Sequence, residues 1–213
     1  MRSCFRRWNG FWSRERRRFS LRIGKLERNT RETQISLSWN LDGQGKYEGT
    51  CGVGFFDHMM QALCVHGGFD IILSMKGDLE VDCHHSIEDL GIVMGGALRE
   101  ALKDKGGIQR YGSFYIPMDE ALGFCALDVS GRAFLVFEAS YENPSVGALD
   151  CCMVKEFFRA LAFGAGLTLH LKVMYGENDH HKIEALFKAF AHALKEAVRE
   201  NQGGVLSSKG VLE

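Results

Sequence analysis

Apolar and polar residues alternate in several short segments of this chain, whereas elsewhere the apolar residues recur at steps of three and four. The first pattern is typical of half-buried strands and the second of amphipathic helices. We predict a strand at 32–41 and a turn at 42–45 that leads into a second strand. Further strands are predicted at 69–75, 79–83, 113–118, 121–129, 133–140 and 167–175. We predict helices at 57–66, 88–103, 154–165 and 183–198.

The same order of elements occurs twice, and each copy ends in a helix introduced by the motif His-His-x-x-Glu. The motif starts at His84 and at His180, and Ile87 and Ile183 each lie three residues after the first histidine. The two helices therefore match in register, which indicates an internal duplication. We predict an α+β fold of two strand-strand-helix-strand-helix halves, at about 20–107 and 108–203, followed by a C-terminal tail.

Composition narrows the class of protein. The formal net charge is −1, so nucleic acid is not an expected partner, and no apolar segment is long enough to span a bilayer. Seven cysteines without a secretory signal or a Cys-x-x-Cys pair favour reduced thiols in the cytoplasm. Residues 1–19 hold seven arginines and one acidic residue. We interpret them as a flexible basic arm or an upstream extension, with an organelle-targeting segment as the alternative.

The repeated motif predicts two metal sites. Residues four apart on a helix share a face, whereas adjacent residues point about 100° apart. Each motif can therefore present its first histidine and its glutamate to one ion, and its second histidine to another. If a pseudo-twofold axis relates the halves, the two motifs complete each other. One ion would be bound by His84, Glu88 and His181, and the other by His180, Glu184 and His85.

The remaining histidines carry weaker signals. His170 lies on the polar face of its predicted strand, and His58 follows Asp57 at a strand-to-helix corner, so either could add a ligand or support one. Several imidazoles with one carboxylate suit manganese, iron, cobalt or zinc, and not calcium or magnesium. His66 could be only a charge complement to a helix C-terminus. We predict that His192 is exposed to solvent.

Basic and hydroxyl side chains beside glycines suggest that a ligand carries a phosphate group. Arg110 and Arg132 lie at predicted strand starts, and Lys188 lies on the same helix face as the second motif. Each of these residues alone is more often a surface ion-pair partner. The C-terminal Ser-Ser-Lys-Gly segment supplies the last candidates, which are Ser207, Ser208 and Lys209.

These candidates fall within a series of ordered motifs. In chain order the motifs are FFDHMM, HGGFDI, DCHHSIEDLGIVMGGALREAL, GIQRYGSFYIPMDEAL, DVSGR, TLH, GENDHHKIEALFKAFAHAL and SSKG. Together they resemble the imidazoleglycerol-phosphate dehydratases of histidine biosynthesis, from about Arg22 to the end of the chain. Two departures are Leu206, where the family usually has proline, and the arginine-rich residues 1–19.

The resemblance implies dehydration of erythro-imidazoleglycerol phosphate to imidazole-acetol phosphate, via an imidazolate intermediate held by two manganese(II) ions per active site. It also implies a homo-oligomer of 24 subunits and a fold whose helices are sandwiched between two four-stranded mixed sheets. One ion would be bound by His58, His85, His180 and Glu184, and the other by His84, Glu88, His170 and His181. The implied substrate contacts are Glu32, His66, Arg110, Arg132, Lys188, Ser207, Ser208 and Lys209.

The reaction needs a base, and Glu32 is the candidate, with metal-bound water as its competitor and Asp119 and Glu120 less favoured. Glu32 and the six motif residues form the candidate catalytic set. Two other functions fit parts of the pattern. A di-metal hydrolase of phosphate esters would usually rely on bridging carboxylates, whereas each predicted site here has one glutamate. A metal store or sensor would leave Arg110, Arg132 and Lys209 without a purpose.

Overall fold

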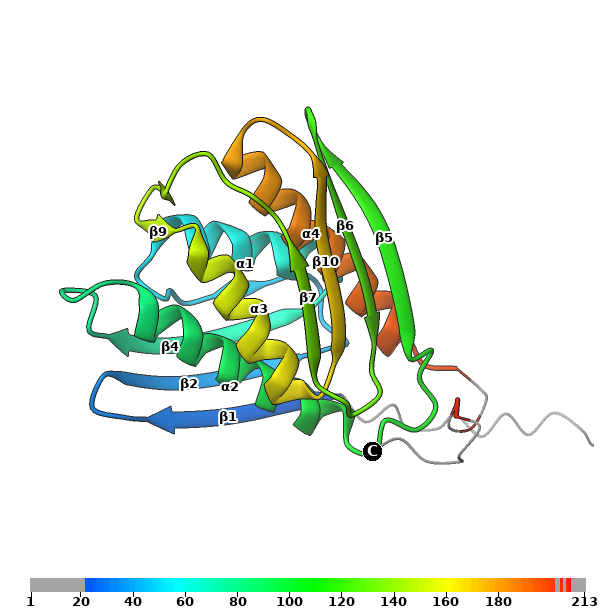
Figure 1. Cartoon of the computed structure of the whole chain (residues 1–213). Helices are drawn as coiled ribbons and strands as arrows, with labels where there is room; N and C mark the ends of the chain where they lie inside the picture. The colour runs from blue at the N-terminus through cyan, green and yellow to red at the C-terminus, as the bar shows by residue number, and fades with distance from the viewer. Residues whose placement is uncertain (1–21, 202–203, 205, 208–213) are drawn as a thin grey trace, which may run out of the picture.

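Two four-stranded sheets enclose four helices in the computed structural model, which describes residues 22–201, 204, 206 and 207 (Figure 1). Each sheet contains both antiparallel and parallel strand pairs. The predicted α+β class and the sandwich of helices between mixed sheets are therefore confirmed. Residues 1–19, Ser208 and Lys209 lie outside the described residues.

The first half contains three strands, a helix, a fourth strand and a second helix. These are β1 (Ile23–Asn29), β2 (Thr33–Asn40), β3 (Tyr47–Glu48), α1 (Gly54–Gly67), β4 (Asp70–Gly77) and α2 (His84–Leu102). The strands lie in the order β1-β2-β4-β3. Along β2 the buried side chains of Ile35, Leu37 and Trp39 alternate with more exposed ones, so one face of the sheet packs against the helices.

The second half repeats this arrangement. Its elements are β5 (Tyr111–Met118), β6 (Ala121–Asp128), β7 (Phe134–Glu138), β8 (Ser145–Val146), β9 (Leu149–Asp150), α3 (Cys152–Ala165), β10 (Thr168–Tyr175) and α4 (Asp179–Val198). The main sheet has the order β5-β6-β10-β7, while β8 and β9 form a separate two-stranded sheet. Each strand of the main sheet takes the place of its counterpart in the first half, which confirms the internal duplication.

The helices pack in pairs that join the two halves. α1 contacts α4, and α2 contacts α3, so each pair contains one helix from each half. Buried aromatic rings join α1 to α4, where the ring centroids of Phe56 and Phe187 lie 5.6 Å apart, and α3 packs its own rings against both of these helices. The ring centroids of Phe56 and Phe157 lie 4.9 Å apart, and those of Phe158 and Phe187 lie 4.8 Å apart. The halves therefore share one core, and this core holds the histidine-bearing ends of α1 and α4 against each other.

A glycine at the same place in each half allows a helix to approach the first strand closely. Gly24 is the second residue of β1, and Gly112 is the second residue of β5. A Cβ atom at these glycines would overlap the carbonyl oxygens of Ala97 in α2 and Ala193 in α4, respectively. Because Ala97 and Ala193 hold equivalent positions in their helices, both halves set the distance between helix and sheet in the same way.

Three details differ from the sequence-based predictions. The strand predicted at 79–83 is wrong: the segment is a turn, in which Val81 N–H donates to the carbonyl of Asp78 at 2.9 Å. Strand β1 was not predicted, because Gly24 is the only fully buried residue in it. The second strand expected after the turn at 42–45 is the two-residue β3, which pairs in parallel with β4 and not with β2.

Among the residues that the structure describes, no helix is long and apolar enough to cross a membrane. The six cysteines in the described part of the chain are free thiols, and five of them are buried. Burial raises the pKa of Cys125 far above the usual value for a thiol. Cys125 is therefore protonated and serves in core packing.

Candidate metal centre

The start of α4 is fixed by hydrogen bonds to its first residues. The side chain of Asn178 accepts a hydrogen bond from the backbone N–H of His180 at 2.9 Å, which caps the helix. Asp179 is buried, accepts from two backbone N–H groups at 142–143 at 3.0 and 2.8 Å, and pairs with Lys182 at 2.9 Å. These contacts hold the first turn of α4, and with it His180, against the loop that precedes β8.

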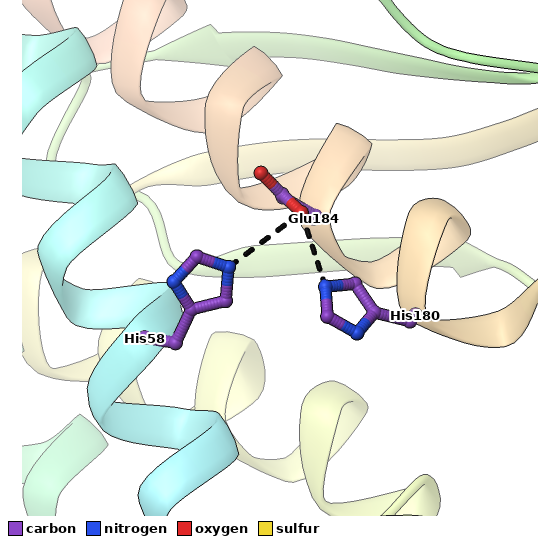
Figure 2. A group of neighbouring side chains, drawn as sticks. All are labelled: His58, His180 and Glu184. Atoms are coloured by element: carbon purple, nitrogen blue, oxygen red, sulfur yellow. Dashed lines mark hydrogen bonds and ion pairs between the residues drawn. The ribbon is translucent and has the colours of Figure 1, made fainter.

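His58, His180 and Glu184 bring three possible metal-ligand atoms within 4.8 Å of one another (Figure 2). Glu184 Oε2 lies 3.2 Å from His180 Nε2 and 3.7 Å from His58 Nε2. The pair on α4 follows from the spacing of the motif, whereas His58 is contributed by α1. In the part of the chain that the structure describes, this is the one group of three such side chains close enough to hold an ion.

Lys188 binds the second oxygen of the carboxylate in this group. Its Nζ lies 2.8 Å from Glu184 Oε1. Burial alone would raise the pKa of Glu184, but Lys188 and then His58 and His180 outweigh this effect and hold the pKa below its usual value. Glu184 is therefore ionised at neutral pH, with Oε2 on the side of the two imidazoles. Lys188, which the resemblance places around the phosphate, is here a partner of the carboxylate.

The chemistry of these donors fits a divalent transition metal. Two imidazole nitrogens and one carboxylate oxygen suit manganese, iron, cobalt or zinc better than calcium or magnesium, which favour sets of oxygen ligands. The side chains of His58 and His180 are 49% and 40% exposed, whereas that of Glu184 is 8% exposed. The group is thus open on its histidine side, where a further ligand or a substrate could approach.

The first motif forms a partial counterpart on α2. His84 Nε2 lies 3.6 Å from Glu88 Oε2, so the helical spacing again joins a histidine to the glutamate four residues later. Arg159 of α3 binds the other oxygen of Glu88, Oε1, at 3.1 Å. Each motif glutamate therefore presents one oxygen to an imidazole and the other to a cationic side chain.

His85 has separate partners, as the angle between adjacent helical residues predicts. Its Nδ1 lies 2.9 Å from Asp78 Oδ2, and its Nε2 lies 3.8 Å from Glu32 Oε1. The hydrogen bond with Asp78 raises the pKa of His85 above its usual value. Within one chain, His85 is therefore placed beside Glu32 and does not belong to the group formed by His180 and Glu184.

His181 is held by the turn between β5 and β6. Its Nδ1 lies 2.7 Å from Glu120 Oε2, and its Nε2 lies 3.6 Å from Asp119 Oδ2. The backbone N–H of Asn178 and the hydrogen bond with His181 lower the pKa of Glu120 to about 2. Glu120, a less favoured base in the sequence, is thus an ionised partner that orients His181. His170 is exposed on β10, outside the group of three.

The two predicted phosphate-binding arginines share one carboxylate. Arg110 Nε and Nη2 donate to the two oxygens of Asp128 at 2.7 and 3.0 Å, and Nη1 donates to the carbonyl of Leu206 at 2.5 Å. Arg132 Nη2 lies 3.9 Å from Asp128, and its side chain is 64% exposed. Arg110 therefore contacts the C-terminal tail at the residue before Ser207.

The prediction that His192 is exposed to solvent is wrong. The residue is half-buried, and its Nε2 lies 3.3 Å from Nδ1 of His66 in α1. Its ring centroid lies 5.4 Å from that of Phe114 in β5. The signal in the sequence was the spacing of four residues from Lys188, which puts His192 beside Lys188, one turn further along α4.

Comparisons with known proteins find the same family along most of the chain. The family model described as imidazoleglycerol-phosphate dehydratase matches residues 51–194. The enzyme of that name from Streptococcus thermophilus is 53% identical over 194 residues, which cover 90% of this chain and 100% of that protein. Its counterpart from Ruminiclostridium cellulolyticum is 54% identical over the same shares of the two chains. The solved imidazoleglycerol-phosphate dehydratase of Staphylococcus aureus matches with 41% identity and a TM-score of 0.76, over 84% of this chain and 99% of that one.

Proposed function

Because the chain belongs to the imidazoleglycerol-phosphate dehydratase family, we propose that it converts erythro-imidazoleglycerol phosphate to imidazole-acetol phosphate and water. The protein is a hydro-lyase of histidine biosynthesis. In the proposed reaction a C–H bond and the adjacent C–OH bond break, water leaves, and the resulting enol becomes a ketone. The observation that carries the proposal is the group of His58, His180 and Glu184, which offers a metal site to an imidazole-bearing substrate.

Manganese(II), with two ions per active site, is the proposed cofactor. When bound, the ions would act as Lewis acids that draw electron density from the imidazole of the substrate and so ease removal of the neighbouring proton. The nitrogen-rich donor set with one carboxylate supports this assignment. The residues proposed to hold one ion are His58, His85, His180 and Glu184. Those proposed to hold the other are His84, Glu88, His170 and His181.

Glu32 is the proposed base. Its carboxylate is 54% exposed and lies 3.8 Å from His85 Nε2, so it is next to a proposed ligand and remains accessible to a substrate proton. Asp78 binds the opposite nitrogen of the same ring and keeps Nε2 on the side of Glu32. This arrangement supports a base at the edge of the metal site rather than among the ligands.

The phosphate group of the substrate is proposed to bind at the arginine pair. Arg132 is exposed enough to contact a phosphate directly. Arg110, whose guanidinium already contacts Asp128 and Leu206, would add positive charge and keep the C-terminal tail nearby. The proposed contacts from that tail are Ser207, Ser208 and Lys209.

A complete site is proposed to form between chains, in a homo-oligomer of 24 subunits. One chain brings together three of the four proposed ligands of the first ion, while His85 is beside Glu32 and His181 is beside Glu120. Ligands from a neighbouring chain would complete both sets. Native mass spectrometry with and without a chelator tests this arrangement, and a monomer with full activity would contradict it.

The test of the function is turnover by the purified protein loaded with manganese. With imidazoleglycerol phosphate as substrate, we expect formation of the ketone, which is followed through the absorbance of its enol in alkali. Chelation should abolish the signal, and manganese should restore it. Absence of product together with hydrolysis of a generic phosphate ester would overturn the proposal in favour of a hydrolase.

A further inference from the structure

Polar side chains form a continuous line along the face of α4 that packs against α1. His180, Glu184, Lys188 and His192 follow one another at steps of four residues, so they form one row that winds around the helix by about 40° at each step. On α1, His58 and His66 are eight residues apart, separated by about 12 Å along the helix. The helices meet at two polar contacts, one at the candidate metal group and one between His66 and His192.

The second contact is enclosed by three elements. His66 Nδ1 and His192 Nε2 lie 3.3 Å apart, and the ring centroids lie 5.3 Å apart at an interplanar angle of 61°. Phe114 of β5 packs against the ring of His192. Both histidines are partly buried, so the ring of His192 is held by packing as well as by its hydrogen bond.

We propose that His192 is a positioning residue, which holds the imidazole of His66 in one orientation and leaves Nε2 as the ring nitrogen available to the substrate. The inference rests on the proposed function and on the substrate contact that the family resemblance implies for His66. A substrate whose imidazole is bound at the group around Glu184 would extend along the same face of α1 and α4 and reach His66.

Burial and the neighbouring charges both favour neutral rings in this pair. Burial lowers the pKa of His66, Lys188 and His192 lower it further, and Glu184 opposes them weakly. Burial and then Lys195 lower the pKa of His192. At neutral pH one ring therefore donates its single N–H to the other. This hydrogen bond uses Nδ1 of His66, and the tautomer that it selects decides whether Nε2 of His66 carries a proton.

Two substitutions at His192 separate the hydrogen bond from the packing. His192→Phe keeps a ring against Phe114 and removes the nitrogen, whereas His192→Gln can place an amide group close to the position of Nε2. Glu196→Gln, on the exposed surface of the same helix, is the matched control. Steady-state kinetics with imidazoleglycerol phosphate and crystal structures of the manganese-loaded proteins supply two separate measurements.

We expect His192→Phe to raise KM roughly fivefold, the equivalent of one neutral hydrogen bond, with a smaller change in kcat. In His192→Gln, KM should return most of the way to its wild-type value. The crystal structure of His192→Phe should show the His66 ring rotated or in several orientations. An unchanged KM with an unmoved His66 ring, or equal damage in both variants, would overturn the inference. If the wild-type protein lacks turnover, the proposed function fails, and the orientation of His66 in the variant crystal still decides the role of His192.

Discussion

Replacing Asp179 by asparagine removes the negative charge from the buried ion pair at the start of α4. The side chains of Asp179 and Lys182 are 2% and 5% exposed, and their charged atoms lie 2.9 Å apart. The other acceptor of Lys182 is the carbonyl of Ser140, at 3.4 Å. Removing one partner of a buried pair typically costs 3–5 kcal/mol, and asparagine keeps one acceptor oxygen, so we expect a loss of about 3 kcal/mol. In a chain of this length that loss corresponds to a decrease in Tm of about 6–12 °C.

The assay is scanning calorimetry of the wild-type protein and Asp179→Asn at equal concentration in a chelator, so that metal binding does not mask the difference. The double variant Asp179→Asn/Lys182→Met serves as a matched control, because it removes both charges and should regain part of the lost stability. If Asp179→Asn stays within about 0.5 kcal/mol of wild type, or if the double variant is less stable still, the buried pair does not fix the start of α4.

Three further predictions concern the pH dependence of Asp179 and the contacts made by Gly112 and Asp128. Burial alone would raise the pKa of Asp179, but Lys182 and the surrounding amides lower it to about 2. The protein in chelator should therefore lose stability as the pH falls from about 4 to 2. Asp179→Asn should flatten this part of the plot of urea midpoint against pH. Gly112→Ala would force a methyl group onto the carbonyl of Ala193 and should lower the free energy of unfolding by about 1–3 kcal/mol in urea titration. Asp128→Asn weakens the bidentate contact to Arg110 and should cost about 1.5–3 kcal/mol in the same titration, while Asp128→Glu should cost less.

Local spacing predicted the part of the site that lies on single helices. His84 and Glu88 meet on α2, and His180 and Glu184 meet on α4, because four residues complete about one helical turn. Spacing could not place His58, since its distance from Glu184 depends on how α1 packs against α4. That contact joins residues far apart in the sequence, and only the family resemblance put them in one ligand set.

The errors in the fold have related causes. The segment 79–83 has the apolar residues of a strand, but Asp82 accepts a hydrogen bond from His84 N–H at 2.7 Å and so turns the chain into α2. β1 was missed because an edge strand with one buried glycine lacks the alternation that marks a half-buried strand. His192 was placed in solvent because the apolar stripe of α4 was considered without the polar face of α1.

The central claim is that His58, His180 and Glu184 bind a metal ion used in the dehydration. Anomalous diffraction at the manganese absorption edge, from crystals of the manganese-loaded assembly, tests this claim most directly. We predict an anomalous peak at coordination distance from His58 Nε2, His180 Nε2 and Glu184 Oε2, which disappears in crystals of Glu184→Gln. Active, fully loaded protein without a peak at these atoms would contradict the account.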